Sequence, residues 1–172
     1  MILTVDIGNT IIAVGGFEGD MLAFVVRLAT NIKETSHEYA AKLDSILRLS
    51  DTETHSLTAA VISSVVPQLT GTIREALKIA FGIDALSVGP GVKTGINIHC
   101  DDPSSVGADL ICVSVAAAKK YGSPCIIVDM GTATKIIHLG KNGTFEGVAI
   151  LPGAEISLSA LADRTAQLPH IA

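Results

Sequence analysis

Two short segments of the sequence combine a carboxylate, a glycine and hydroxyl or amide side chains directly after an apolar run. Residues 5–10 read Val-Asp-Ile-Gly-Asn-Thr, and residues 128–134 read Val-Asp-Met-Gly-Thr-Ala-Thr. Glycine lets a backbone approach an anion closely, and turn N–H groups with Asn or Thr side chains can donate to phosphate oxygens. One such segment alone is often only a structural Asp-Gly turn. Two copies on similar units predict a pair of hairpins that clamp a triphosphate from both sides.

Two carboxylates have positions suited to phosphoryl transfer. Asp6 would be repelled by a phosphate in direct contact, so we expect it to act through Mg²⁺ or its water shell. Asp109 follows Gly107 and Ala108 at the start of a predicted helix, where a carboxylate can also be a simple cap or dipole partner. Its functional interpretation is a general base that accepts a hydroxyl proton. Phosphoryl transfer needs little else from a protein than positioning, charge neutralisation and one base.

The two loops belong to a repeated unit of three strands. Each loop follows a β-branched run and precedes two further apolar runs that are joined by a tight turn. The predicted strands are residues 2–6, 11–17 and 21–28 in the first copy, and residues 125–129, 133–139 and 144–150 in the second. Asn142-Gly143 favours a hairpin in the second copy, because both residues tolerate positive φ.

Helices and two more strands are predicted outside these copies. Apolar residues at helical spacing follow Ser36, the expected N-cap of the first helix. The predicted helices are residues 36–49, 67–81, 106–121 and 154–163, and the predicted strands are residues 57–63 and 86–88. The first half thus has the order β-β-β-α-β-α-β, and the repeat suggests domains 1–122 and 123–172. A strand, a helix and a final strand would be needed after residue 172 to complete the second copy.

Composition and charge exclude several other classes of protein. The chain has 172 residues, of which 48% are hydrophobic and 17% charged, with a net charge of −5. An acidic chain without Lys/Arg clusters does not favour nucleic-acid or anionic-membrane binding. The three cysteines and five histidines have neither disulfide nor metal spacing. The N-terminus does not read as a signal peptide and no apolar run is long enough to span a membrane, so we expect a cytoplasmic protein.

The order of motifs along the chain resembles the type III pantothenate kinases, also called the Bvg accessory factor family. The motifs that carry the resemblance are residues 5–10, 62–67, 88–96, 107–109, 129–134, 151–153 and 164–169. The resemblance implies an α/β, actin-like (ribonuclease H-like) fold of two duplicated domains, with the second copy incomplete here, and a homodimer. It also implies ATP-dependent phosphorylation of pantothenate to 4′-phosphopantothenate, the first step of coenzyme A biosynthesis.

The resemblance also implies roles for individual residues. Asp109 would be the catalytic proton acceptor, and Asp129 would bind a monovalent cation, K⁺ or NH₄⁺, alongside the Mg²⁺ that accompanies ATP. ATP would be bound by Asp6, Ile7, Gly8, Asn9, Thr10, Ile11, Ile12 and Ala13, with Thr132 on the opposite side. Pantothenate would be bound by Cys100, Gly107, Ala108, Asp109 and Leu110.

Three departures from the family pattern fall in the substrate half of this site. The family typically has Arg where this chain has Leu110, often Tyr where it has Cys100, and Asn where it has Asp102. An Arg fork can bind a carboxylate and a leucine cannot. Two alternatives to a pantothenate kinase therefore stay open. One is a degenerate ATP-binding paralogue that acts as a regulator or partner subunit, and the other is a kinase of the same superfamily for another small hydroxylated substrate.

Overall fold

The computed structural model describes residues 1–50 and 56–165, which divide into two compact units. Unit 1 comprises Met1–Val92 and Gly107–Asp109, and unit 2 comprises Lys93–Val106 and Leu110–Ala172. The elements of unit 1 are β1 (Ile2–Ile7), β2 (Ile11–Glu18), β3 (Met21–Ala29), α1 (Ser36–Leu49), β4 (Ala59–Ser64), α2 (Pro67–Phe81) and β5 (Leu86–Ser87). The elements that follow are η2 (Pro103–Ser105), α3 (Ala108–Tyr121), β6 (Cys125–Met130), β7 (Ala133–Leu139), η3 (Lys141–Gly143), β8 (Phe145–Pro152) and α4 (Ala154–Arg164).

Unit 1 is built on a five-stranded sheet with the order β3-β2-β1-β4-β5. Strands β1, β2 and β3 form an antiparallel meander, whereas β4 pairs parallel to β1, and β5 pairs parallel to β4. The parallel pairs need crossover connections, which the α1 and α2 segments provide. The predicted order β-β-β-α-β-α-β is confirmed.

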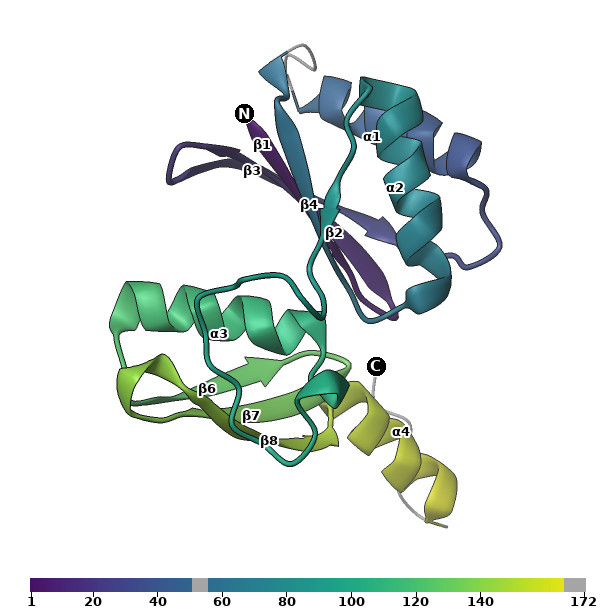
Figure 1. Cartoon of the computed structure of the whole chain (residues 1–172). Coiled ribbons are helices and arrows are strands. Elements are labelled where there is room, and N and C mark those ends of the chain that lie inside the picture. Colours follow the sequence, from purple (N-terminus) through teal and green to yellow (C-terminus); the bar gives the residue numbers. More distant parts are fainter. Residues whose placement is uncertain (51–55, 166–172) are drawn as a thin grey trace. The chain divides into compact units, whose positions relative to one another are not determined.

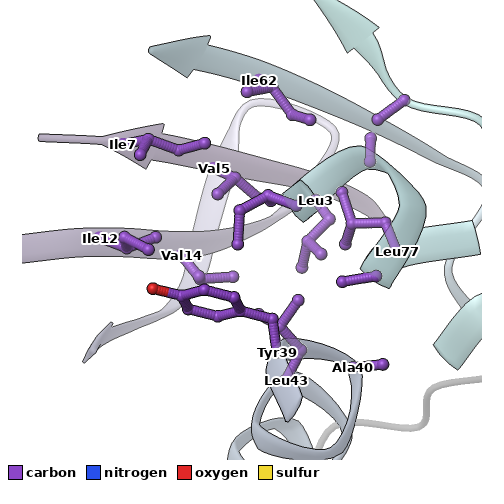
Figure 2. Packing of buried hydrophobic residues seen from close by; sticks show 14 of the residues in the cluster. Leu3, Val5, Ile7, Ile12, Val14, Tyr39, Ala40, Leu43, Ile62 and Leu77 are labelled. Atoms are coloured by element: carbon purple, nitrogen blue, oxygen red, sulfur yellow. The ribbon is translucent and has the colours of Figure 1, made fainter. Parts of the chain in front are cut away.

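Helices α1 and α2 lie on one face of this sheet and enclose the core of unit 1 with it (Figure 1). Leu3, Val5 and Ile7 alternate with more exposed residues along β1, as expected for a strand with one buried face. Figure 2 shows these side chains with the Tyr39 ring from α1 and Leu77 from α2. The core is almost wholly aliphatic, and Tyr39 is its one fully buried aromatic side chain among the described residues of this cluster.

The ends of the first two helices follow from local sequence. Thr35 is the N-cap of α1, and its side chain and that of Glu38 form a capping box. The expectation that Ser36 is the cap is therefore wrong by one residue, because only Thr35 has Glu at its third following position. Helix α2 begins at Pro67 and ends before Gly82, whose φ of 69° gives a left-handed C-cap, and these bounds match the predicted helix of residues 67–81.

Unit 2 contains a three-stranded antiparallel sheet with the order β6-β7-β8, and α3 packs along it (Figure 1). Ile137, Leu139 and Phe145 are its most buried apolar side chains, and they cluster with Leu110 and Ala117 of α3. The β7–β8 connection has Asn142 and Gly143 at φ of 62° and 71°, so the predicted use of positive φ is confirmed. The opposite side of the sheet carries exposed apolar residues, including Ile126, Val128 and Met130.

The compact units differ from the domain bounds 1–122 and 123–172 suggested by the repeat. The loop before α3 and most of α3 belong to unit 2, because their apolar residues pack against the second sheet. The domain bounds 1–122 and 123–172 describe where the repeated unit begins again, and they remain a prediction. None of the helices in residues 1–50 and 56–165 has the length and apolar character required to cross a membrane.

Candidate active site

The first phosphate-type loop connects the end of β1 to the start of β2. The Gly8 N–H donates to the Ile11 carbonyl oxygen at 3.0 Å and closes the loop. A Cβ atom on Gly8 would lie 2.9 Å from that same oxygen, so a larger residue would force the loop open. Asn9 and Thr10 at its tip are exposed. The loop therefore presents polar side chains to solvent from a tightly closed backbone.

The other residues expected at ATP are less accessible. The side chains of Ile7 and Ile12 are fully buried in the core of unit 1, and Ala13 is half-buried. Contact of Ile7 or Ile12 with a nucleotide would therefore require their backbone atoms. Ile11 is 46% exposed and lies at the start of β2, beside the loop.

Asp6 is oriented by a buried serine from the neighbouring strand. Asp6 of β1 and Ser63 of β4 are direct partners in the parallel register, and the Ser63 hydroxyl donates to Asp6 Oδ1 at 3.0 Å. Ser63 is only 8% exposed, so the Asp6 carboxylate is held by a buried residue of the neighbouring strand. The sequence analysis did not assign Ser63 to the site, although it lies late in a predicted strand and within the 62–67 motif.

Thr30, the first residue after β3, holds the loop from the other side. The Thr30 hydroxyl donates to the Gly8 carbonyl oxygen at 2.7 Å, and the Thr30 N–H donates to the Thr10 carbonyl oxygen at 2.9 Å. The next residue, Asn31, is fixed in turn: its N–H donates to the Tyr39 hydroxyl, which donates to the Asn31 carbonyl oxygen, both at 3.0 Å. The loop is thus anchored, through the two residues that follow β3, to the buried Tyr39 ring of α1. Sequence analysis identified none of these supports.

Asp109 lies at the same end of the first sheet as this loop. Gly107 lies near Val65, since a Cβ atom added to Gly107 would be 3.7 Å from Val65 Cγ1. The Val65 N–H in turn donates to the Ile7 carbonyl oxygen at 3.0 Å. The same added Cβ would lie 2.5 Å from Asp109 Oδ1, so glycine leaves the space that the carboxylate occupies. Parallel strands β1 and β4 both end here, and ligands of open α/β sheets bind outside such carboxyl ends.

In unit 2, the second loop packs against the start of α4. The Gly131 N–H donates to the Ala133 carbonyl oxygen at 3.2 Å, and the Gly153 N–H donates to the Thr132 carbonyl oxygen at 3.1 Å. A Cβ atom on Gly153 would overlap the carbonyl oxygens of Gly131 and Thr132. Gly153 is therefore required for this approach, and Thr132 stays exposed. Gly153 ends the Leu-Pro-Gly motif, whose first two residues are the last two of β8, and this contact explains its glycine.

Asp129, the expected cation ligand, has a lysine beside it. Asp129 of β6 and Lys135 of β7 are direct cross-strand partners, and Lys135 Nζ lies 2.7 Å from Asp129 Oδ2. Elsewhere in the part of the chain that the structure describes, no group of three or more His, Cys, Asp or Glu could hold a metal ion. Mg²⁺ needs no such cage, because it is usually held by one or two carboxylates together with substrate phosphates. The carboxylate of Asp6 could hold Mg²⁺ in this way, together with the phosphates of a nucleotide.

The expected substrate residues Cys100 and Leu110 line one pocket within unit 2, together with Asp102. The pocket has a volume of about 920 Å³ and is lined by His99, Cys100, Asp101, Asp102, Ser105, Val106, Leu110, Phe145, Glu146, Gly147, Val148 and Ile150. Three of these described residues are acidic and none is Lys or Arg. The departures noted in the sequence thus meet in a single acidic pocket.

Hydrogen bonds from Ser104 stabilise the ionised form of Asp102 in this pocket. The Ser104 hydroxyl donates to Asp102 Oδ1 at 2.6 Å and the Ser104 N–H donates to it at 3.0 Å. These hydrogen bonds, the hydroxyl first, lower the pKa of the Asp102 carboxyl below its ordinary value. Leu110, by contrast, is only 6% exposed and also packs in the apolar cluster of unit 2.

The predicted site residues thus fall into two groups. The first loop, Gly107, Ala108 and Asp109 belong to unit 1, whereas Cys100, Leu110, Asp129 and Thr132 belong to unit 2. Within unit 1 the structure brings the loop and Asp109 to one end of the sheet. The clamp of ATP between the two hairpins remains a prediction.

Comparison with known proteins identifies the family. A sequence model of the type III pantothenate kinases matches residues 2–172. The type III pantothenate kinase of Shouchella clausii is 42% identical over 172 residues, an alignment that covers 99% of this chain and 67% of that protein. The type III pantothenate kinase of Bifidobacterium animalis is 40% identical, with 99% of this chain and 68% of that protein covered.

A solved structure confirms the predicted fold class. A protein of Sinorhizobium meliloti assigned as a 2-dehydro-3-deoxygalactonokinase superposes with a TM-score of 0.56 at 15% identity, covering 96% of this chain and 57% of that one. At such low identity the likeness shows only the actin-like fold shared with sugar kinases. Together with the family match and the two relatives, it leads to one conclusion: the chain belongs to the type III pantothenate kinase family.

Proposed function

We propose that this protein phosphorylates pantothenate with ATP to give 4′-phosphopantothenate, the first step of coenzyme A biosynthesis. Membership of the family supports the reaction, and the geometry of unit 1 supports the chemistry. The observation that carries the proposal is the joint position of the Asp6–Thr10 loop and Asp109, which is made possible by the glycine at position 107. A polar loop and a carboxylate at one sheet end are the parts that phosphoryl transfer requires.

Each residue then has a defined role in the transfer. The backbone N–H groups and the Asn9 and Thr10 side chains bind phosphate oxygens of ATP. Asp109 accepts the proton of the pantothenate hydroxyl as its oxygen bonds to the γ-phosphorus, and the bond from that phosphorus to the β,γ-bridging oxygen breaks to release ADP. Mg²⁺ supplies charge neutralisation when it is bound with ATP, and Asp6, oriented by Ser63, would hold it or its waters.

Two finer features belong to the proposal on the strength of the resemblance: a homodimer and a cytoplasmic location. The resemblance also implies a monovalent cation at Asp129, which is not made part of this proposal. Thr132 would complete the nucleotide site from unit 2. The homodimer would be tested by sedimentation equilibrium, and the cation is considered separately below because Lys135 contacts the same carboxylate.

One observation favours a second candidate function. Cys100, Asp102 and Leu110 line an acidic pocket, and among its described lining residues none could pair with the carboxylate of pantothenate as Arg would. Such a pocket suits a neutral or cationic acceptor with a hydroxyl group. The alternative is therefore a kinase of the same superfamily for another small hydroxylated substrate. A degenerate paralogue would instead bind ATP and transfer phosphate to no acceptor.

ADP release tests these possibilities directly. The purified chain would be supplied with ATP, Mg²⁺ and K⁺, with and without pantothenate, beside its Asp109→Asn variant. We expect release that depends on pantothenate and falls at least ~100-fold in the variant, since general-base catalysis contributes about that much. Release with other hydroxylated acceptors but not pantothenate would support the second candidate. Nucleotide binding without any release would support the degenerate paralogue.

A further inference from the structure

The carboxylate expected to bind a monovalent cation already has a positive group in contact with it. Lys135 Nζ lies 2.7 Å from Asp129 Oδ2. The strand register enforces this pairing, because Asp129 and Lys135 are opposite each other in the antiparallel β6–β7 pair. Side chains opposite each other in such a pair point to the same face and lie close together. The contact is therefore built into the hairpin that carries the second loop.

Lys135 is also more sheltered than an ordinary surface lysine. Its side chain is 19% exposed, and that of Asp129 is 37% exposed. Lysine is mostly an exposed residue, whereas this one is largely covered and its ammonium has a partner. A fully exposed ion pair of this kind would contribute little to the stability of the fold. The shelter of Lys135 instead holds its charge beside the loop that contains Gly131 and Thr132.

The Asp129 carboxylate does not fit a K⁺ or NH₄⁺ site while this lysine contacts it. A second cation on the same carboxylate would meet the Lys135 ammonium within a few ångström, and like charges at that range repel. A lysine ammonium is itself a compact, strongly hydrated point charge with three N–H donors. It is therefore the chemical counterpart of NH₄⁺, attached to the chain.

We propose that Lys135 supplies at Asp129 the positive charge that a bound monovalent cation would otherwise supply. The inference rests on the proposed function, in which Asp129 borders the phosphate site. Lys135 acts as a positioning residue. It neutralises Asp129, so that the loop containing Gly131 and Thr132 can bind a phosphate without repulsion from that carboxylate. The protein then needs no K⁺ or NH₄⁺ to bind nucleotide.

The test compares nucleotide affinity in potassium and in an inert cation. A non-hydrolysable ATP analogue with Mg²⁺ would be titrated by calorimetry into the full chain, in KCl or in tetramethylammonium chloride at equal ionic strength. Wild-type affinity should change less than ~2-fold between the salts. The Lys135→Met variant, of similar length but uncharged, should bind about 10-fold more weakly in tetramethylammonium and regain most of the loss in KCl or NH₄Cl, a coupling of ordinary size. Lys141→Met, on an exposed turn, is the matched control and should behave as the wild type.

A second readout needs neither nucleotide nor turnover. Thallium(I), a spectroscopic substitute for K⁺, would be titrated into the same proteins and followed by thallium NMR. We expect saturable binding to Lys135→Met and none to the wild type or to Lys141→Met. Lys135→Thr replaces Lys135→Met if that variant does not fold, and the wild-type titration decides by itself if neither folds.

The outcomes separate this inference from the proposed function. A wild type that binds thallium, or whose nucleotide affinity rises about 10-fold with K⁺, would overturn the role of Lys135 while leaving the kinase intact. A folded Lys135→Met variant indifferent to K⁺ and thallium would overturn it as well. Failure to phosphorylate pantothenate would overturn the proposed function without affecting either binding result.

Discussion

Gly107 and Asp109 show how one residue without a side chain can position one that reacts. An added Cβ at Gly107 would lie 2.5 Å from Asp109 Oδ1, closer than a carbon and an oxygen can approach without contact strain. A Cβ atom at position 107 would therefore require the Asp109 carboxylate to move from the position it occupies. Sequence analysis identified both residues as one motif, but the physical reason for the glycine became visible only with the Asp109 side chain in place.

The first prediction concerns this pair. Gly107→Ala should displace the Asp109 carboxylate and lower kcat by about 100-fold, as far as Asp109→Asn does, because both remove a correctly placed base. Nucleotide affinity should stay within about 3-fold of the wild type, since the loop residues are unchanged. Steady-state kinetics and nucleotide titration measure the two effects. Gly71→Ala is the control, because a Cβ there meets nothing within 4 Å. Normal kcat in Gly107→Ala would contradict the positioning role.

The second prediction concerns the acidic pocket of unit 2. Asp102→Asn removes one negative charge and keeps an oxygen that can accept from Ser104. The KM for anionic pantothenate should fall about 2- to 5-fold at low salt, with kcat unchanged, and the gain should shrink as salt screens the charge. Asp84→Asn, on the surface of unit 1, is the control. An unchanged KM at low salt would show that the pocket does not bind the carboxylate end of the substrate.

This substitution is a cleaner test than restoring the family's Arg. Leu110 is 6% exposed and packs with Ile137, Leu139 and Phe145. An arginine there would bring a charge into the apolar cluster and cost stability unless it found a partner. A loss of activity in Leu110→Arg could then arise from unfolding alone. Asp102 lies on the exposed side of the pocket and avoids that difficulty.

At the scale of elements, the phosphate loop depends on the segment that follows β3 as much as on the strands it joins. Thr30 contacts the loop at two carbonyl oxygens, those of Gly8 and Thr10. The following residue is bound to the buried Tyr39 of α1. The core of unit 1 thus fixes a loop at its surface, and preorganisation of this kind lowers the entropic cost of binding.

The third prediction tests this support. Thr30→Val keeps the shape of the side chain but removes the hydroxyl that donates to the Gly8 carbonyl oxygen. Loss of one hydrogen bond typically costs about 1 kcal/mol, so nucleotide affinity should fall about 3- to 10-fold. Thr72→Val on α2 removes a hydroxyl far from the loop in the sequence and serves as the control. Calorimetric titration measures both, and equal affinities would indicate that the loop does not need Thr30.

Helices and strands were predicted well where their bounds depend on a local sequence pattern. The strands of both copies follow alternation, and α2 follows Pro67 and Gly82, so their bounds differ from the prediction by a residue or two. Ser63 and Thr30 could not be predicted as site residues, because their roles depend on the register between segments 57 and 22 residues apart in the chain. The pairing of Asp129 with Lys135 has the same origin.

At the scale of the whole molecule, the repeated hairpin unit explains why one sequence motif occurs twice. The matching strand–loop–strand arrangements of β1–β3 and β6–β8 confirm the repeat. The family and fold were predictable because motifs recur in order along nearly the entire chain. The matched relatives are longer, since this chain covers 67% of the first of them. The boundary between compact units was not predictable, because it depends on where the segment before α3 packs.

The most direct test of the proposed function is to follow the γ-phosphate of ATP itself. ATP labelled in that phosphate would be incubated with the chain, Mg²⁺ and either pantothenate or 4′-deoxypantothenate, which lacks the acceptor hydroxyl. We predict label in 4′-phosphopantothenate with the first acceptor and no organic phosphate with the second. Label that passes only to water, or to no product while ATP still binds, would contradict phosphorylation of pantothenate by this protein.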